Sequence, residues 1–281
     1  MKSLLNNLKL NNKFVLLYLP ITLMLFWTLF PIYWIINTSF KNNGDILQKS
    51  QDYFPVNPTT ANFVAAWDNV GFGVYFKNST IVGVSTVLVV VGLSILAGYA
   101  ISRYKFKGKA LTLVLFLATQ FIPRNMLIIP MFTLFKTMGL INSPLALVLT
   151  YSAVEIPFTA VLMSGFVSNV PKELEEAAEI DGCSKFQVMR YVMLPLLLPG
   201  ISATAIFTFI YAWNEFLIAL MLNTQQSRFT LPVGLNFLIG ENTVNYGVLA
   251  AGGVIVLIPS ILLFAYAQKH LISGMSGAVK G

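Results

Sequence analysis

The sequence predicts an all-α integral membrane protein with six transmembrane helices. Of its 281 residues, 56% are hydrophobic and only 10% are charged, whereas soluble domains carry about 25% charged residues. A soluble core could not bury this much apolar surface, so we expect the bilayer to be the solvent. Six segments have the roughly 20 apolar residues that a spanning helix needs. Their approximate bounds are 14–36, 80–102, 110–134, 145–167, 198–222 and 247–268.

The first 79 residues are predicted to contain a tail, the first span and a long loop. The apolar stretch at 14–36 is longer than that of a signal peptide and lacks a small-residue cleavage site, so we expect it to be retained. In the loop at 37–79, FPVNPTTANF is turn-rich and predicts irregular chain. The stretch AAWDNVGFGVYF predicts a short helix at the membrane surface.

The other five spans form a predicted transmembrane core at 80–271, followed by a tail at 272–281. The span at 80–102 is uninterrupted. The spans at 110–134, 145–167 and 198–222 contain, among other residues, Pro123, Arg124, Asn125, Pro130, Glu155, Pro157, Trp213, Asn214 and Glu215.

Lysine and arginine are unevenly distributed over the connectors, which predicts the orientation of the chain. One side receives both termini and the connectors after the second and fourth spans, which hold most of the basic residues. We therefore expect a prokaryotic cell-membrane protein with cytoplasmic termini. The net charge of +7 does not indicate nucleic acid binding, because the basic residues are spread over connectors rather than gathered on one face.

The cytoplasmic connector at 171–195 is predicted to form two short helices joined by a glycine turn. Pro171 suits the first turn of a helix, and KELEEAAEI supplies helix formers with glutamates near the N-terminus, where the helix dipole favours them. Gly182 suits a left-handed C-cap. Ser184 with Gln187 forms a capping-box pattern that starts the second helix.

The second helix of this connector is predicted to carry an apolar stripe of Phe186, Met189 and Met193. Two interpretations stay open at this point. The helix could lie on the membrane or pack under its own bundle, or it could occupy a groove of a soluble partner.

The connector also contains a spaced motif: Glu176-Ala177-Ala178, then Gly182, then Val192-x-Leu194-Pro195. This motif resembles the EAA loop of ABC importer permeases, with valine in place of the usual isoleucine, and we call residues 171–195 the EAA loop. Nearly the whole chain is similar to MalG-like carbohydrate importer permeases, which have the MetI-like fold. The supporting stretches are Asn78-Ser79, IPRNMLIIPMFTLF, YAWNEF, FTLPVGL and SGMSGAVKG.

The resemblance implies a type I ABC importer permease whose EAA loop is a coupling helix that docks on a cytoplasmic ATPase. It implies as partners a second homologous permease, two ATPase subunits and an extracellular or periplasmic solute-binding protein, with a sugar as substrate. The segment 223–245 would reach into the binding protein. The expected docking residues are Glu176, Ala177, Ala178 and Gly182 from the motif, with Phe186 and Met189 added from the apolar stripe.

The chain itself lacks a nucleotide-binding motif. Its only Gly-Lys pair, Gly108-Lys109, is followed by Ala110 and has no matching glycine before it, so it is not a P-loop. A single cysteine, Cys183, excludes an intrachain disulfide, and a single histidine, His270, excludes a two-histidine metal site. We therefore expect no catalytic site, metal or cofactor in this chain, with ATP and Mg²⁺ bound by the partner ATPase.

Ionisable residues within spans are costly and are candidates for a substrate path. Arg124 and Asn125 lie in a proline-broken stretch, which is tolerated where it lines a cavity or packs on protein. Arg124 could also lie at the outer interface. Glu155 could pair with Arg124 or line the path.

The stretch Trp213-Asn214-Glu215 suits a sugar, because an indole face can stack on C–H groups while the polar groups bond hydroxyls; packing against the partner permease is the alternative. We predict import of a sugar or oligosaccharide by alternating access. One alternative is glycerol phosphate or a phosphodiester, for which Arg124 is the only cation within the spans. The other is an ion-coupled secondary transporter or an intramembrane enzyme, against which stand the EAA spacing and the lack of an inverted repeat.

Overall fold

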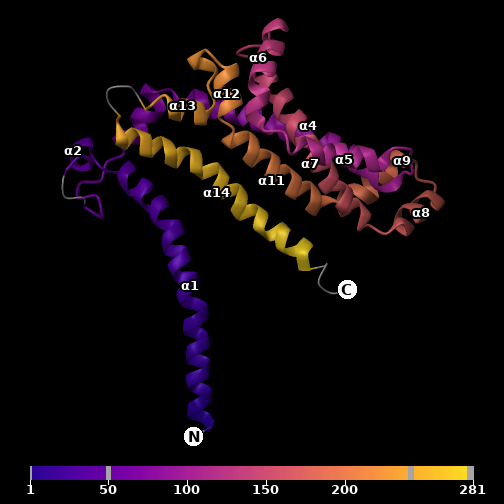
Figure 1. Ribbon diagram of the computed structural model, residues 1–281, viewed down its shortest axis with the longest axis horizontal. Coiled ribbons are helices and arrows are strands. Elements are labelled where there is room, and N and C mark those ends of the chain that lie inside the picture. Colours follow the sequence, from indigo (N-terminus) through magenta and orange to yellow (C-terminus); the bar gives the residue numbers. More distant parts are fainter. Residues whose placement is uncertain (1, 49–51, 240–243, 277–281) are drawn as a thin grey trace. The chain divides into compact units, whose positions relative to one another are not determined.

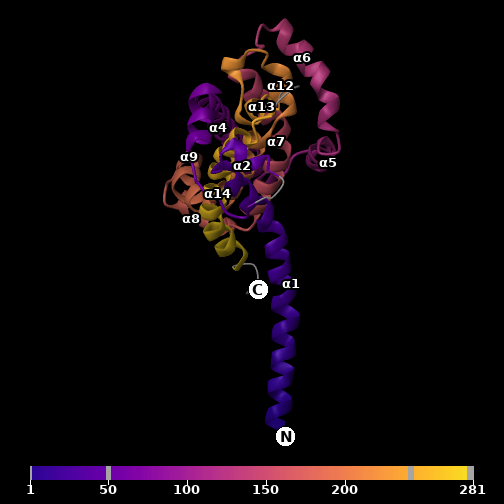
Figure 2. The same cartoon turned by 90° about the vertical axis from the view of Figure 1, so that its left-hand side faces the viewer.

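The computed structural model describes residues 2–48, 52–239 and 244–276, whose regular structure is helical. These residues form two compact units, one from 1–70 with 238–255 and one from 71–237 with 256–281. Figures 1 and 2 show the helices from two directions. Parts of the predicted 223–245 loop and of the 272–281 tail lie outside the described residues.

Within the described residues, four helices are long and apolar enough to cross a membrane on their own. They are α1 (Lys2–Ser39), α4 (Phe72–Arg103), α7 (Pro144–Ser168) and α14 (Tyr246–Ser276). Two bent pairs raise the number to six if each counts as one span, namely Lys109–Thr119 with Arg124–Thr137, bent by 92°, and Lys185–Leu196 with Leu198–Asn214, bent by 74°.

The predicted span at 110–134 is therefore not one helix. The chain forms α5 (Lys109–Thr119), the 3-10 turn η2 (Arg124–Leu127) and α6 (Ile128–Thr137). Pro123 causes the break, because proline has no N–H to donate and disfavours helical backbone in the residue before it.

The prediction that AAWDNVGFGVYF forms a single surface helix is also wrong. Its first half forms a π-helical turn, η1 (Ala65–Asn69), directly after α3 (Ala61–Val64), and its second half is the start of α4. Gly71, with φ +89°, separates the two. The helix α4 thus begins eight residues before the predicted span.

In the first unit, the end of α1 is held by a polar cluster. The side chain of Asn62 donates to the carbonyl oxygens of Ser39 and Lys41 at 2.9 and 2.7 Å. The Lys41 ammonium lies 5.1 Å from the ring centre of Trp34. The short helix α2 (Asn43–Ile46) follows directly.

In the second unit, α4 packs along α7 and along α11 (Leu198–Asn214) (Figure 1). Gly98 permits a close approach of α4 and α7, because a Cβ there would lie 2.8 Å from the backbone nitrogen of Ser164. A buried hydroxyl pair, Ser94 and Thr159, joins α4 to α7 at 2.6 Å.

The chain after α11 returns to the start of α4 through α12 (Leu217–Leu222), η4 (Gln226–Arg228) and α13 (Leu231–Asn236). Asn78 donates to the carbonyl oxygens of Ser227 and Phe229, each at 2.9 Å. The Ser79 hydroxyl accepts from the Leu231 N–H at 2.8 Å. The Asn78-Ser79 and FTLPVGL stretches are therefore in direct contact.

Candidate functional site

The EAA loop has the predicted helix–glycine–helix conformation. Its first helix is α8 (Lys172–Ile180), which follows Pro171. Gly182 has φ +88°, a left-handed conformation that glycine adopts without steric cost. The capping box is present, since the Ser184 N–H donates to the Gln187 side chain at 2.7 Å and the Ser184 hydroxyl accepts from the Gln187 N–H at 3.4 Å.

The predicted apolar stripe on the second helix is wrong. After α9 (Lys185–Gln187) the helix continues as a π-helical segment, η3 (Val188–Met193), before α10 (Leu194–Leu196). A π-helix bonds i to i+5, so residues spaced for a regular α-helix no longer share one face. Phe186 is 78% exposed, whereas Val188 and Met193 are buried in a cluster with Met163.

The predicted docking residues are mostly accessible. Glu176, Ala177, Gly182 and Phe186 are exposed, and Ala178 and Met189 are half-buried. Two apolar side chains of this loop that were not predicted are equally exposed, Ile180 at 86% and Tyr191 at 71%. Exposed apolar side chains on a polar loop favour contact with another protein.

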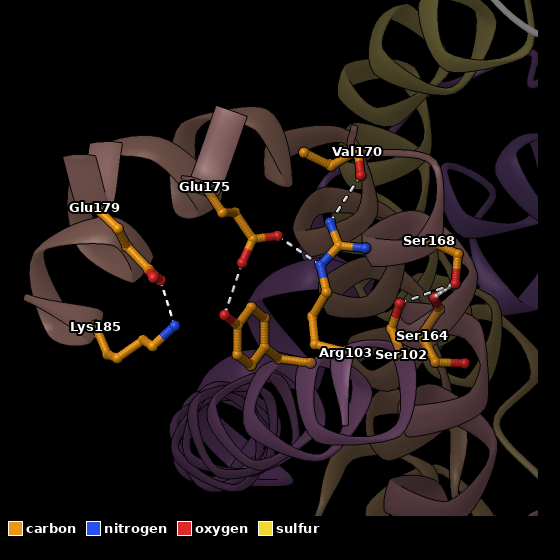
Figure 3. Close-up of polar contacts among 9 residues, drawn as sticks. Ser102, Arg103, Ser164, Ser168, Val170, Glu175, Glu179 and Lys185 are labelled. Carbon is orange, nitrogen blue, oxygen red and sulfur yellow. Dashed lines mark hydrogen bonds and ion pairs between the residues drawn. The ribbon is translucent and has the colours of Figure 1, made fainter. Parts of the chain in front are cut away.

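The most enclosed polar contact of the loop was also not predicted (Figure 3). The Nε of Arg103, the last residue of α4, donates to the Glu175 carboxylate at 2.5 Å, and both side chains are only 9% exposed. The other Glu175 oxygen accepts from the Tyr99 hydroxyl at 2.7 Å. Arg103 also donates to the Val170 carbonyl oxygen at 2.7 Å. We call Tyr99, Arg103 and Glu175 the α4 anchor.

A surface cavity of about 220 Å³ lies beside the α4 anchor, with Lys172, Glu176 and Glu179 in its wall. Glu179 and Lys185 form an ion pair across the glycine turn (Figure 3). The hydrogen bond that the Lys185 ammonium donates to the Glu179 carboxylate raises the pKa of Lys185. Both side chains are exposed, Lys185 by 69% and Glu179 by 37%, so this pair contributes little to stability.

A second cavity, of about 450 Å³, lies where η2 and α6 meet the break between α11 and α12. Its wall contains four of the six residues predicted for the substrate path: Arg124, Asn125, Asn214 and Glu215. Tyr211, which was not predicted, lies in the same wall, and its buried hydroxyl has no hydrogen-bond partner in the described residues.

Glu155 lies next to this cavity and pairs with Arg124, one of the two arrangements predicted for it. The Arg124 guanidinium is 3.7 Å from the Glu155 carboxylate. The same guanidinium lies over the Tyr211 ring, 4.4 Å from its centre, a geometry that adds cation–π attraction. Glu155 is buried, whereas the Arg124 side chain is 49% exposed.

Glu215 closes the break between α11 and α12. Its carboxylate accepts from the Ile218 and Ala219 N–H groups at 2.8 and 3.0 Å and from the Tyr151 hydroxyl at 2.7 Å. Negative charge at a helix N-terminus satisfies otherwise unbonded N–H groups. The cavity wall therefore presents one guanidinium and one carboxylate, and a second carboxyl group, that of Glu155, lies 3.7 Å from the guanidinium.

Trp213 does not face this cavity. Its indole N–H donates to the Val256 carbonyl oxygen at 3.1 Å, and its ring packs against Phe209 and Phe76 at centroid distances of 5.2 and 5.5 Å. The side chain is buried, so the indole has no free face for a sugar in this conformation. We therefore leave Trp213 out of the proposed substrate path.

The described residues contain no cluster of histidine, cysteine, aspartate and glutamate that could hold a metal ion. Helices that are long and apolar enough to span a membrane, a polar cavity at a helix break and an exposed EAA loop are typical of an integral membrane transport subunit. The profile of the family described as "Binding-protein-dependent transport system inner membrane component" matches residues 90–277. The chain belongs to this family.

Curated relatives match the chain over nearly its full length. It is 37% identical to the diacetylchitobiose uptake system permease protein DasC of Streptomyces coelicolor, over 90% of this chain and 92% of that protein. It is 33% identical to the trehalose/maltose transport system permease protein MalG of Thermococcus litoralis, over 96% and 98%.

A solved structure shares the fold. It belongs to a bacterial ABC transporter involved in the import of the acidic polysaccharide alginate, and one of its chains matches with a TM-score of 0.81 at 21% identity, over 92% of this chain and 96% of that chain. The predicted MetI-like permease fold is thereby confirmed.

Proposed function

We propose that this chain is the permease subunit of an ATP-driven importer that moves a sugar or oligosaccharide into the cell. The observation that carries this proposal is the near full-length similarity to permeases named for sugar uptake. In the proposed mechanism the chain alternates between outward-open and inward-open states, and Arg124, Asn125, Tyr211, Asn214 and Glu215 line the path.

The energy for this cycle is supplied by partner chains. The EAA loop is cytoplasmic in this proposal, as are both termini, and its exposed side chains dock on one of two ATPase subunits that bind ATP and Mg²⁺. A second, homologous permease completes the membrane channel. An extracellular or periplasmic solute-binding protein delivers the sugar.

The charge balance of the larger cavity favours an uncharged substrate over a phosphate ester. Arg124, the cation in the cavity wall, lies 3.7 Å from the carboxyl group of Glu155 beside the cavity, and Glu215 adds a carboxylate to the wall itself. An anionic ligand would meet no surplus positive charge here. Sugar hydroxyls can instead bond to amide, carboxylate and phenol groups.

The test is uptake by the complete importer, reconstituted in liposomes with its partner permease, ATPase and binding protein. Radiolabelled maltose, trehalose and diacetylchitobiose serve as neutral probes, and glycerol 3-phosphate serves as the anionic probe. We expect ATP-dependent accumulation of at least one neutral probe and none of the anionic one. Uptake that follows a proton gradient without ATP would refute the proposal in favour of a secondary transporter.

A further inference from the structure

The α4 anchor joins the EAA loop to the membrane core by side chains rather than by the backbone alone. Arg103 ends α4, Glu175 lies in the first turn of α8, and Val170 lies in the short link between α7 and α8. Arg103 therefore holds both α8 and the link that precedes it (Figure 3).

The neighbouring end of α7 is fixed to α4 as well. The hydroxyls of Ser102 and Ser168 lie 3.0 Å apart, and the Ser168 hydroxyl donates to the Ser164 carbonyl oxygen at 2.7 Å. Ser168 lies two positions before Val170 in the sequence, and Figure 3 shows these contacts beside the α4 anchor. The end of α7, the link and α8 are thus all attached to the last turn of α4.

The other end of α4 is attached to a different segment. Asn78 and Ser79 bond the backbone of residues 227–231, and this segment leads into α13. With a rise of about 1.5 Å per residue, the distance along α4 from Ser79 to Arg103 is roughly 36 Å. One helix therefore connects the EAA loop at one end with the 223–237 segment at the other.

We propose that Arg103, Glu175 and Tyr99 are positioning residues for ATP-driven transport. They hold α8 on α4, so that displacement of the EAA loop moves α4 and its distant contacts. If the α4 anchor is broken, α8 remains joined by the backbone at Val170 and Pro171, and the loop can move without carrying α4. This inference rests on the proposed function, in which a partner ATPase moves the EAA loop.

The proposal is tested with Glu175→Gln, which removes the charge while retaining the size of the side chain. Glu173→Gln is the matched control, because Glu173 lies in the same first turn of α8 and is exposed. For the complete importer in liposomes, we measure maltose, trehalose or diacetylchitobiose accumulated per ATP hydrolysed, using the sugar that the wild type transports. We also measure retention of the ATPase subunits.

We expect Glu175→Gln to retain the ATPase subunits but to accumulate about 3- to 10-fold less sugar per ATP, a range typical of residues that carry coupling between sites. Glu173→Gln should match the wild type. A wild-type ratio in Glu175→Gln would overturn the proposal, and so would loss of the ATPase subunits, which would show that the anchor only shapes the docking surface. If the wild type itself binds no ATPase, it is the proposed function that fails.

If the Glu175→Gln protein does not fold or insert into the membrane, two milder variants test the proposal. Tyr99→Phe removes one hydrogen bond to Glu175, and Arg103→Lys keeps the charge but cannot reproduce the second bond to Val170. Both should lower the ratio of sugar to ATP by about two- to fivefold, in line with the loss of one hydrogen bond. Rescue of the ratio in Arg103→Lys relative to Arg103→Gln would support the proposal. Wild-type ratios in both milder variants would overturn it.

Discussion

Replacing Gly98 by alanine should loosen the contact between α4 and α7, whereas the same change at Gly92 should not. A Cβ at position 98 would lie 2.8 Å from the backbone nitrogen of Ser164 and 2.8 Å from the Cβ of Met163. Both atoms are fixed to the α7 backbone, so neither can rotate away. A Cβ at position 92 of the same helix would meet no atom within 4 Å.

The difference between the two variants isolates the cost of the contact. Both substitutions gain the same helix propensity, about 1 kcal/mol in favour of alanine over glycine. Forcing an extra methyl group into a well-packed interface costs about 1–3 kcal/mol. Since the propensity term cancels, Gly98→Ala should be less stable than Gly92→Ala by about 1–3 kcal/mol.

Thermal unfolding of the purified importer in detergent, measured for both variants and the wild type, provides the assay. Gly98→Ala should unfold at a lower temperature than the wild type, and Gly92→Ala at the same or a higher temperature. ATP-driven sugar uptake should decrease in the same order. Equal unfolding midpoints for the two variants would refute the reasoning that close approach of α4 and α7 at Gly98 stabilises the core.

Three further predictions concern the EAA loop and the polar groups of the spans. Gly182→Val should strain the left-handed turn by about 1–2 kcal/mol. Both Gly182→Val and Glu176→Lys should release the ATPase in pull-downs while the protein stays inserted in the membrane. If either variant retained ATPase binding and transport, the docking assignment would be contradicted. Glu155→Ala should alter uptake or substrate preference, because it leaves Arg124 without its partner; if both are unchanged, Glu155 is not part of the path. Trp213→Phe should lower the free energy of unfolding by more than about 1 kcal/mol, because the lost hydrogen bond alone costs about that much and the smaller ring leaves space beside Phe209 and Phe76. Substrate preference should not change, and a changed preference in competitive uptake would return Trp213 to the path.

The features of the EAA loop that were predicted correctly are those set by neighbours in sequence. Gly182 has the left-handed backbone conformation, and the Ser184–Gln187 box forms as expected. Caps and turns depend on residues two to four positions apart, so a short stretch of sequence contains the whole signal. The pairing of Arg124 with Glu155 could be predicted from the sequence for a different reason. Few ionisable residues lie in the spans, and each of them needs a partner.

The features that were missed depend on packing between distant segments. The π-helical turn changes which residues of η3 face the core. Periodicity assumes a regular helix, so the predicted stripe of Phe186, Met189 and Met193 was wrong. Arg103 and Glu175 are 72 positions apart, and nothing local distinguishes Glu175 from the adjacent Glu176. Only the fold shows that one glutamate is buried against α4 and that the other is exposed.

Glu215 illustrates why a residue can be required by the fold and still be available to a substrate. In the hydrocarbon region of a bilayer, each unbonded backbone group costs several kcal/mol, so a broken helix is tolerated only where other groups satisfy it. The Glu215 carboxylate bonds the freed N–H groups of Ile218 and Ala219, and it also lies in the cavity wall. The break that creates the cavity therefore demands an acceptor at that position. The same group then presents oxygen atoms to whatever occupies the cavity, so the polar path and the interrupted helix have a common physical cause.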